Sequence, residues 1–219
     1  MRFVARSVLA CILSASLIGL PTFATPNRPL GFVLAAQDAA LDGNVAASGA
    51  NIYDGDTVAT GSSGQVRLQF EGNQVYFSPS SVAKLTTTGS VVTALLTSGT
   101  AGFTSASGGA VAIRALDVLV RPQTVQPTTA QITIIAADEL KVASIAGPLT
   151  LELDGEAYTL TPGRTYGVKI VADNATPFQN DQFAARKRRG LIIFVFSATA
   201  AAAALTYLIK ELKESPDTP

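Results

Sequence analysis

The sequence contains no histidine, no tryptophan and a single cysteine among its 219 residues. Histidine is the most common general base of enzymes and the most common metal ligand, so its absence removes both roles. The one cysteine, Cys11, lies inside an N-terminal apolar run, and a chain cleaved behind that run contains no thiol. The composition therefore excludes Ser-His-Asp and Cys-His catalysis and the usual zinc sites.

Positive charge is scarce in the body of the chain. From Thr25 to Ala185 there are eight Lys and Arg residues against thirteen Asp and Glu residues, a net charge of about −5. A mildly acidic body repels the phosphates of nucleic acids and of anionic lipids. We therefore expect no nucleic-acid partner for this part of the chain.

Residues 1–24 have the pattern of a secretory signal. Two arginines precede an apolar run from Val8 to Leu20, and small residues lead to a cleavage site after Ala24. We predict that this segment is removed; an uncleaved N-terminal anchor is the alternative that the same run leaves open. Residues 25–41 are then predicted to be a leader segment in front of the folded domain.

The stretch from Asn51 to Leu85 predicts a β-meander. Its predicted turns are Asp54-Gly55-Asp56, Gly61-Ser62-Ser63-Gly64 and Glu71-Gly72-Asn73. Between the last two turns the residues alternate, with Val66, Leu68 and Phe70 on one side, as in a half-buried strand. Glycine tolerates positive φ, so we expect Gly55 and Gly61 to hold that conformation.

Short apolar runs continue at strand spacing to about Val171, and no segment among them has a helical period. One of them, residues 149–160, reads as a hairpin centred on Asp154-Gly155. This pattern predicts a single all-β domain over residues 42–172, folded as a sandwich or in a barrel-like form.

Residues 190–209 are twenty residues without a charge. A helix of that length spans about 30 Å, which is one hydrocarbon core. We predict a single transmembrane helix here, in contact with membrane lipid, and self-association through the alanine run at 200–204 is a further hypothesis. A linker over residues 173–189 precedes the helix and a short charged tail, 210–219, follows it. The linker ends in a membrane flank of four basic residues, Arg186, Lys187, Arg188 and Arg189.

Acidic side chains cluster at two places. Asp54 and Asp56 could form a weak calcium site, but no third acidic residue follows at loop spacing, so a polar turn is the preferred interpretation. Glu152, Asp154 and Glu156 alternate along a strand, yet Asp154-Gly155 is itself the turn, and a solvated hairpin tip is expected. Paired carboxylates can hydrolyse glycosides, but the chain has no tryptophan to build a sugar platform. We read four serines as turn formers, because no base lies nearby in sequence: Ser62, Ser63, Ser80 and Ser81. We therefore predict no catalytic, cofactor-binding or metal-binding residue, and a protein that is not an enzyme.

The central stretch resembles the FecR-type domain. The family's "GD-x-V/L-x-T-G" step is similar to Gly55 to Gly61, and its next strand is similar to Val66 to Gly72. The residues that match the motif, which we interpret as structural turns, are Gly55, Asp56, Thr60, Gly61 and Gly72. The resemblance implies an all-β extracytoplasmic domain. In the iron-citrate type of regulator, that domain relays a signal from an outer-membrane receptor to a cytoplasmic sigma factor.

The chain is most similar to stand-alone FecR-like proteins that carry a signal peptide and a C-terminal helix. We expect an exported, non-catalytic protein-binding or sensory module of the bacterial envelope, held as a single-pass protein in the cell membrane with its β domain in the periplasm. The positive-inside rule alone favours the opposite orientation of the basic flank. A structural or scaffolding envelope protein is the alternative function.

Overall fold

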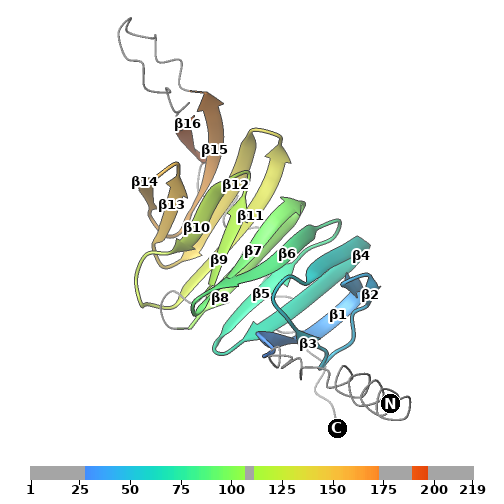
Figure 1. Ribbon diagram of the computed structural model, residues 1–219. Helices are drawn as coiled ribbons and strands as arrows, with labels where there is room; N and C mark the ends of the chain where they lie inside the picture. Colours follow the sequence, from blue (N-terminus) through green and yellow to red (C-terminus); the bar gives the residue numbers. More distant parts are fainter. Residues whose placement is uncertain (1–27, 107–110, 173–188, 197–219) are drawn as a thin grey trace, which may run out of the picture.

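The computed structural model describes residues 28–106, 111–172 and 189–196, and every regular element in these ranges is a β-strand (Figure 1). The strands are β1 (Gly31–Leu41), β2 (Asn44–Val45), β3 (Asn51–Ile52), β4 (Thr57–Phe70), β5 (Asn73–Phe77), β6 (Val82–Thr88), β7 (Val91–Ser98), β8 (Thr100–Ser105), β9 (Val111–Ala115), β10 (Val118–Pro122), β11 (Thr128–Ala136), β12 (Glu139–Ala146), β13 (Leu149–Leu153), β14 (Glu156–Leu160), β15 (Arg164–Ala172) and β16 (Arg189–Phe196). The predicted all-β class is confirmed.

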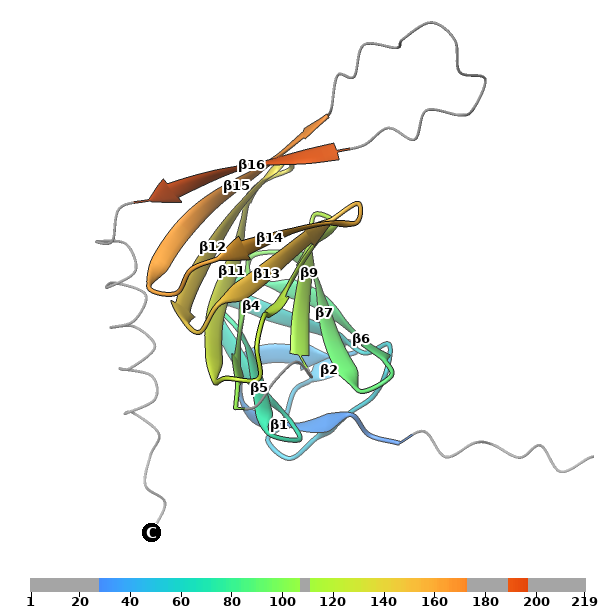
Figure 2. The same cartoon turned by 90° about the vertical axis from the view of Figure 1, so that its left-hand side faces the viewer.

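Hydrogen bonding joins these strands into one sheet, in the order β14-β13-β10-β9-β7-β6-β4-β5-β8-β11-β12-β15-β16. Strand β1 pairs along β4 and also with the short strands β2 and β3. We call β14 to β6 in this order the first arm and β5 to β16 the second arm; β4 joins them. The sheet curls so that β11 lies against β7 and β9, which makes it a half-barrel (Figure 2).

The hydrophobic core fills the inside of this curl. Fully buried side chains come from β4 and from both arms, among them Phe70, Phe77, Phe103, Ile113 and Leu151. On β4 the predicted alternation is confirmed, since Val66, Leu68 and Phe70 are buried whereas Gln65 is exposed. Each large apolar side chain buried in this way contributes roughly 1.5–3 kcal/mol to folding, so the core holds the two arms together.

The predicted turn at Gly61-Ser62-Ser63-Gly64 is wrong, because these residues lie inside the continuous strand β4. They form a large β-bulge. Thr60 pairs with Ala39 and Gln65 pairs with Gln37, which leaves only Asp38 opposite these four residues. On the other edge of β4, residues 57–59 pair with β6 and residues 66–70 pair with β5. The bulge is therefore the point at which β4 changes partner and the two arms diverge.

The two glycines of the bulge are needed for close approach rather than for positive φ. A Cβ at Gly64 would fall on the backbone oxygen of Asp38, and a Cβ at Gly61 would fall on its carboxylate. Asp38 itself has a φ of 43°. The bend of β4 thus requires two residues without side chains in front of one residue in a left-handed conformation.

Of the other predicted turns, two have the expected backbone conformation and one does not. Gly55 has the expected positive φ of 95°, and the hairpin at Asp154-Gly155 is confirmed, with φ values of 50° and 88°. At the turn between β4 and β5, Glu71 rather than Gly72 takes the left-handed conformation, with a φ of 46°. A further turn of this kind, Leu116-Asp117, separates β9 from β10, with φ values of 47° and 70°.

Two boundaries differ from the prediction. Residues 25–41 were expected as a leader, but Gly31–Leu41 form β1, which pairs with β4 over most of its length. Residues 190–196, the first part of the predicted transmembrane helix, lie in β16, which pairs with β15. The local reason is the high β-propensity of Ile192 to Phe196, all β-branched or aromatic, beside an open strand edge. Residues 197–209 lie outside the described residues.

A search of the described ranges for a helix long and apolar enough to span a membrane finds none. The signal segment at residues 1–24, the basic residues Arg186, Lys187 and Arg188, and the tail at 210–219 also lie outside these ranges.

Candidate functional site

The motif residue Thr60 belongs to a buried hydroxyl network that ties β4 to the β5–β6 connection. Its Oγ1 donates to the carbonyl oxygen of Ser78 at 2.7 Å and accepts from the backbone N–H of Ser81 at 2.9 Å. Ser81 is fully buried, and its Oγ accepts from the N–H of Thr100 and donates to the carbonyl oxygen of the same residue, both at 2.9 Å. The network therefore joins the segment around Ser81 to the start of β8 as well.

This network explains why hydroxyl groups are present at Thr60 of the motif and at Ser81. The backbone of Ser81 lies beside the bulge of β4, where its carbonyl oxygen accepts from the N–H of Thr60, and Thr100 lies just beyond the last pair of the β5–β8 ladder. Neither residue has a regular ladder partner for all of its backbone groups on this side, and buried N–H and C=O groups need partners. Thr60 and Ser81 supply them. The two hydroxyl groups thus complete the backbone bonding of the fold, and neither is held beside a general base within the described residues.

Both carboxylates of the first turn bind backbone N–H groups. Asp56 Oδ2 accepts from the N–H of Tyr53 at 2.8 Å, and Asp54 Oδ1 accepts from the N–H of Thr87 at 2.7 Å. The first bond closes the turn, and the second ties it to the end of β6. Among the described residues no group of three or more His, Cys, Asp or Glu side chains is arranged to hold a metal ion.

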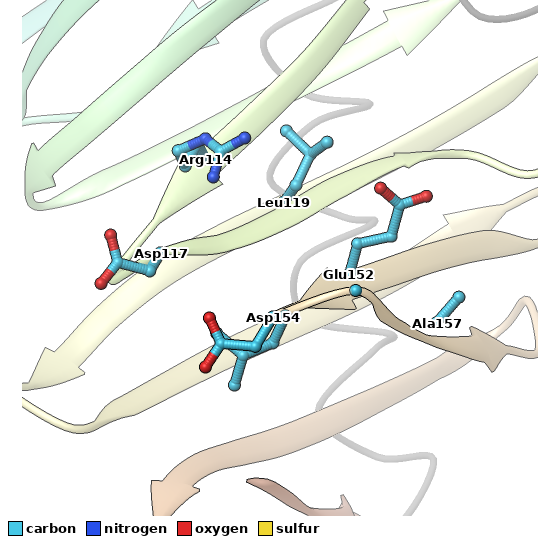
Figure 3. Close-up of a pocket in the computed structure, with 8 residues that line it drawn as sticks. Arg114, Asp117, Leu119, Glu152, Asp154 and Ala157 are labelled. Atoms are coloured by element: carbon cyan, nitrogen blue, oxygen red, sulfur yellow. The ribbon is translucent and has the colours of Figure 1, made fainter. Parts of the chain in front are cut away.

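A hollow of about 550 Å³ lies on the first arm, beside the tips of two hairpins (Figure 3). The loops Leu116-Asp117 and Asp154-Gly155 each turn in two residues of positive φ. They lie at the same end because β10 pairs with β13, with Leu119 opposite Glu152. The side chains around the hollow include those of Arg114, Asp117, Leu119, Glu152, Asp154 and Ala157. We call this surface the hairpin-tip hollow.

The charges in the hairpin-tip hollow are of both signs. Arg114 faces the same space as Asp117, Glu152 and Asp154, so carboxylates outnumber the guanidinium groups that line it. Glu152 is held by Arg121, whose Nε donates to Oε1 at 2.9 Å. Both side chains of this ion pair are partly solvent-exposed, 47% for Arg121 and 33% for Glu152. An exposed pair of this kind orients the carboxylate but adds at most about 1 kcal/mol of stability.

On β14, next to the hollow, Tyr158 donates its hydroxyl proton to Glu156 Oε2 at 2.7 Å. This hydrogen bond, with smaller contributions from desolvation and from the charge of Glu156, raises the pKa of Tyr158 above its usual value. The neutral phenol is favoured because ionisation would place two negative charges side by side. Glu156 therefore orients the phenol ring of Tyr158 at the surface of this hairpin.

The structure thus brings together residues that the sequence pattern had separated. Glu152 and Asp154 lie with Arg114 and Asp117, which are about 35 residues earlier in the chain. Sequence reasoning missed Arg114, Asp117 and Asp38, since strand pairing between distant segments creates their surroundings. Asp38 and Asp117 had a local signal of the same kind, because Asp tolerates the left-handed conformation that both of them adopt.

The described residues form an all-β domain with an open, polar hollow at the tips of two hairpins. No family model matches the chain. No curated protein matches it either. Two crystal structures of a candidate anti-sigma factor from Parabacteroides distasonis ATCC 8503, at 2.50 Å and 1.65 Å resolution, are similar to it.

Each of these two structures is 12% identical in sequence to this chain, with a TM-score of 0.48 and coverage of 68% of this chain. The chain spans slightly less than two thirds of their length, 63% and 64% respectively. A likeness this distant assigns no function to the chain.

Proposed function

We propose that this chain is a FecR-like, exported and membrane-anchored module that binds a protein in the bacterial envelope and acts there as a sensor or adaptor without catalysis. One observation carries the proposal: the polar side chains of the motif residues Asp56 and Thr60, and of Asp54 and Ser81 beside them, are bound to backbone groups of the fold. Asp54, Asp56, Thr60 and Ser81 each hold a backbone N–H or C=O group. Because these side chains stabilise the fold, we infer that other residues, on the exposed surface, bind the partner protein.

The hairpin-tip hollow is the surface that we assign to recognition. It is open and lined by one guanidinium and three carboxylates, whereas a small-molecule site is usually enclosed and mainly apolar. Polar side chains of both signs, held on tight two-residue turns, suit the rim of a protein–protein interface. An acidic surface also favours a partner that presents Lys or Arg.

Export and anchoring are supported by the sequence. The signal-like segment at residues 1–24 and the uncharged run at 190–209 lie on either side of the β domain, and the basic flank stands next to the second of them. In this proposal the β domain is in the periplasm and residues 190–209 contact membrane lipid.

In-cell photo-crosslinking tests the proposal. A photoreactive amino acid replaces Ala157, which is exposed in the hollow, and in a matched control it replaces Val45, which is 90% exposed on β2. We expect an adduct with another envelope protein at residue 157, at least fivefold above the control, and its loss when Glu152→Lys is added, because this change reverses one of the carboxylates that would attract a basic partner. Equal adduct formation at the two positions would contradict recognition by the hollow. Adducts only between copies of this chain would favour the scaffolding alternative.

A further inference from the structure

The last strand of the second arm, β16, is attached to the sheet on one side only. It pairs antiparallel with β15 over eight residue pairs, from Ala172–Arg189 to Thr165–Phe196. It ends the order of strands within the described residues, and Figure 2 shows it as the outermost strand beyond β15. The edge of β15 is therefore a surface that accepts an extended segment, and its occupant here is the chain's own residues 189–196.

The side chains of β16 are apolar on both faces. Leu191 and Ile193 pair with Ile170 and Val168, share their face and are partly buried against the core. On the opposite face Ile192 is 43% exposed and Phe194 is 51% exposed. Edge strands of soluble sheets are usually protected by charged residues or prolines, and the segment from 190 to 196 has neither.

The same residues are the first part of the uncharged run at 190–209. When 190–196 lie in β16, thirteen residues of the run remain, and as a helix they would measure roughly 20 Å. A hydrocarbon core is about 30 Å thick, so this remainder is too short to cross it. Pairing with β15 and a complete membrane span therefore compete for the same seven residues.

The length of chain between β15 and β16 permits either state. Sixteen residues, 173–188, connect Ala172 to Arg189. Fully extended, they reach roughly 53 Å at about 3.3 Å per residue. Residues 189–196 can therefore leave the sheet without any disruption of β15, whose other edge remains paired with β12.

We propose that residues 189–196 occupy two mutually exclusive places, the edge of β15 and the start of the membrane span, and that membrane insertion opens the β15 edge to an extended apolar segment of a partner. This inference rests on the membrane anchoring included in the proposed function. In the state described here β16 covers the edge in cis. In the inserted state the outer N–H and C=O groups of β15 lose their partners, and strand addition is the binding mode that satisfies such an edge.

Disulfide trapping in the full-length chain tests the competition. Lys169 and Ile192 are cross-strand partners whose side chains are both exposed, and each is replaced by Cys in a Cys11→Ser background. The matched control is the cross-strand pair Thr86 and Thr93 in the β6–β7 hairpin, also replaced by Cys. The chain is synthesised without lipid or with vesicles of phosphatidylcholine and phosphatidylglycerol, oxidised, and washed with alkaline carbonate.

We expect the 169–192 disulfide to form without lipid and to fall at least tenfold in the carbonate-resistant vesicle fraction, while the control disulfide is the same in both. Chain that is oxidised before vesicles are added should fail to become carbonate-resistant. A 169–192 disulfide that persists in the resistant fraction would overturn the competition and leave the anchor intact. Its absence in both conditions would overturn the docking of β16. Complete release by carbonate would refute the anchor, and the competition with it.

Discussion

Removal of the hydroxyl group of Thr60 tests the buried network that supports the bend of β4. Thr60→Val keeps the shape of the side chain and deletes Oγ1, which donates to Ser78 and accepts from the N–H of Ser81. The lost donor bond is worth about 1 kcal/mol, and the buried N–H of Ser81 left without a partner costs about 1–3 kcal/mol more. We therefore expect the free energy of unfolding to fall by about 2–4 kcal/mol.

This loss is large against the total stability of a domain, about 5–15 kcal/mol, and corresponds to a fall in Tm of roughly 5–12 °C. The measurement is thermal and urea unfolding of the full-length chain in mild detergent, followed by circular dichroism. Thr60→Ser retains the hydroxyl group and should lose about 1 kcal/mol or less, and Ser62→Ala, on the exposed part of the bulge, should change stability by under about 0.5 kcal/mol. A Thr60→Val chain within 0.5 kcal/mol of the parent would refute the reasoning.

Two further predictions concern the bulge and the acidic hairpin. Gly64→Ala should destabilise the domain by about 1–3 kcal/mol, because the added Cβ meets the backbone of Asp38, and Asp38→Gly should therefore not rescue it. Gly61→Ala should also destabilise the domain, but its Cβ meets the carboxylate of Asp38, so Asp38→Gly should rescue it in a double-mutant cycle. Equal rescue of both would contradict this assignment. Glu156→Gln should lower the pKa of Tyr158, because it removes the carboxylate that raises it, and absorbance titration of the phenolate checks this. The stabilisation from this bond is present below the unfolded tyrosine pKa of about 10 and is lost as pH rises through the raised folded value; an unchanged titration would argue against the bond.

The strands were largely predictable because their signals are local. The alternation of Val66, Leu68 and Phe70 depends only on which side of a pleated strand meets the core. The turn at Asp154-Gly155 follows from the tolerance of both residues for positive φ. The same reasoning failed at Leu116, which holds a φ of 47° although leucine has no local preference for it. Leu116 is partly buried against the hydrophobic core, and this tertiary contact has no signal in the local sequence.

The candidate site was predictable only in part. The acidic tip of the hairpin was expected as a solvated surface, but its neighbours Arg114 and Asp117 come from another hairpin. The two hairpins lie side by side because β10 pairs with β13. This pairing joins segments that are far apart in the chain, and the sequence of neither strand indicates its partner. Similarly, Asp54 binds the N–H of Thr87, 33 residues away, through the arrangement of the sheet.

By itself the sequence determined the all-β class, the alternation along the strands and the exclusion of histidine- and cysteine-dependent chemistry, because these depend on composition and on periods of a few residues. Only the tertiary structure decided what Gly61-Ser62-Ser63-Gly64 does. Its glycines suit a turn equally well, and the passage of Asp38 on the neighbouring strand makes it a bulge at which β4 changes partner. The tertiary structure also placed residues 189–196 at the edge of β15, since an apolar segment joins whichever partner buries it.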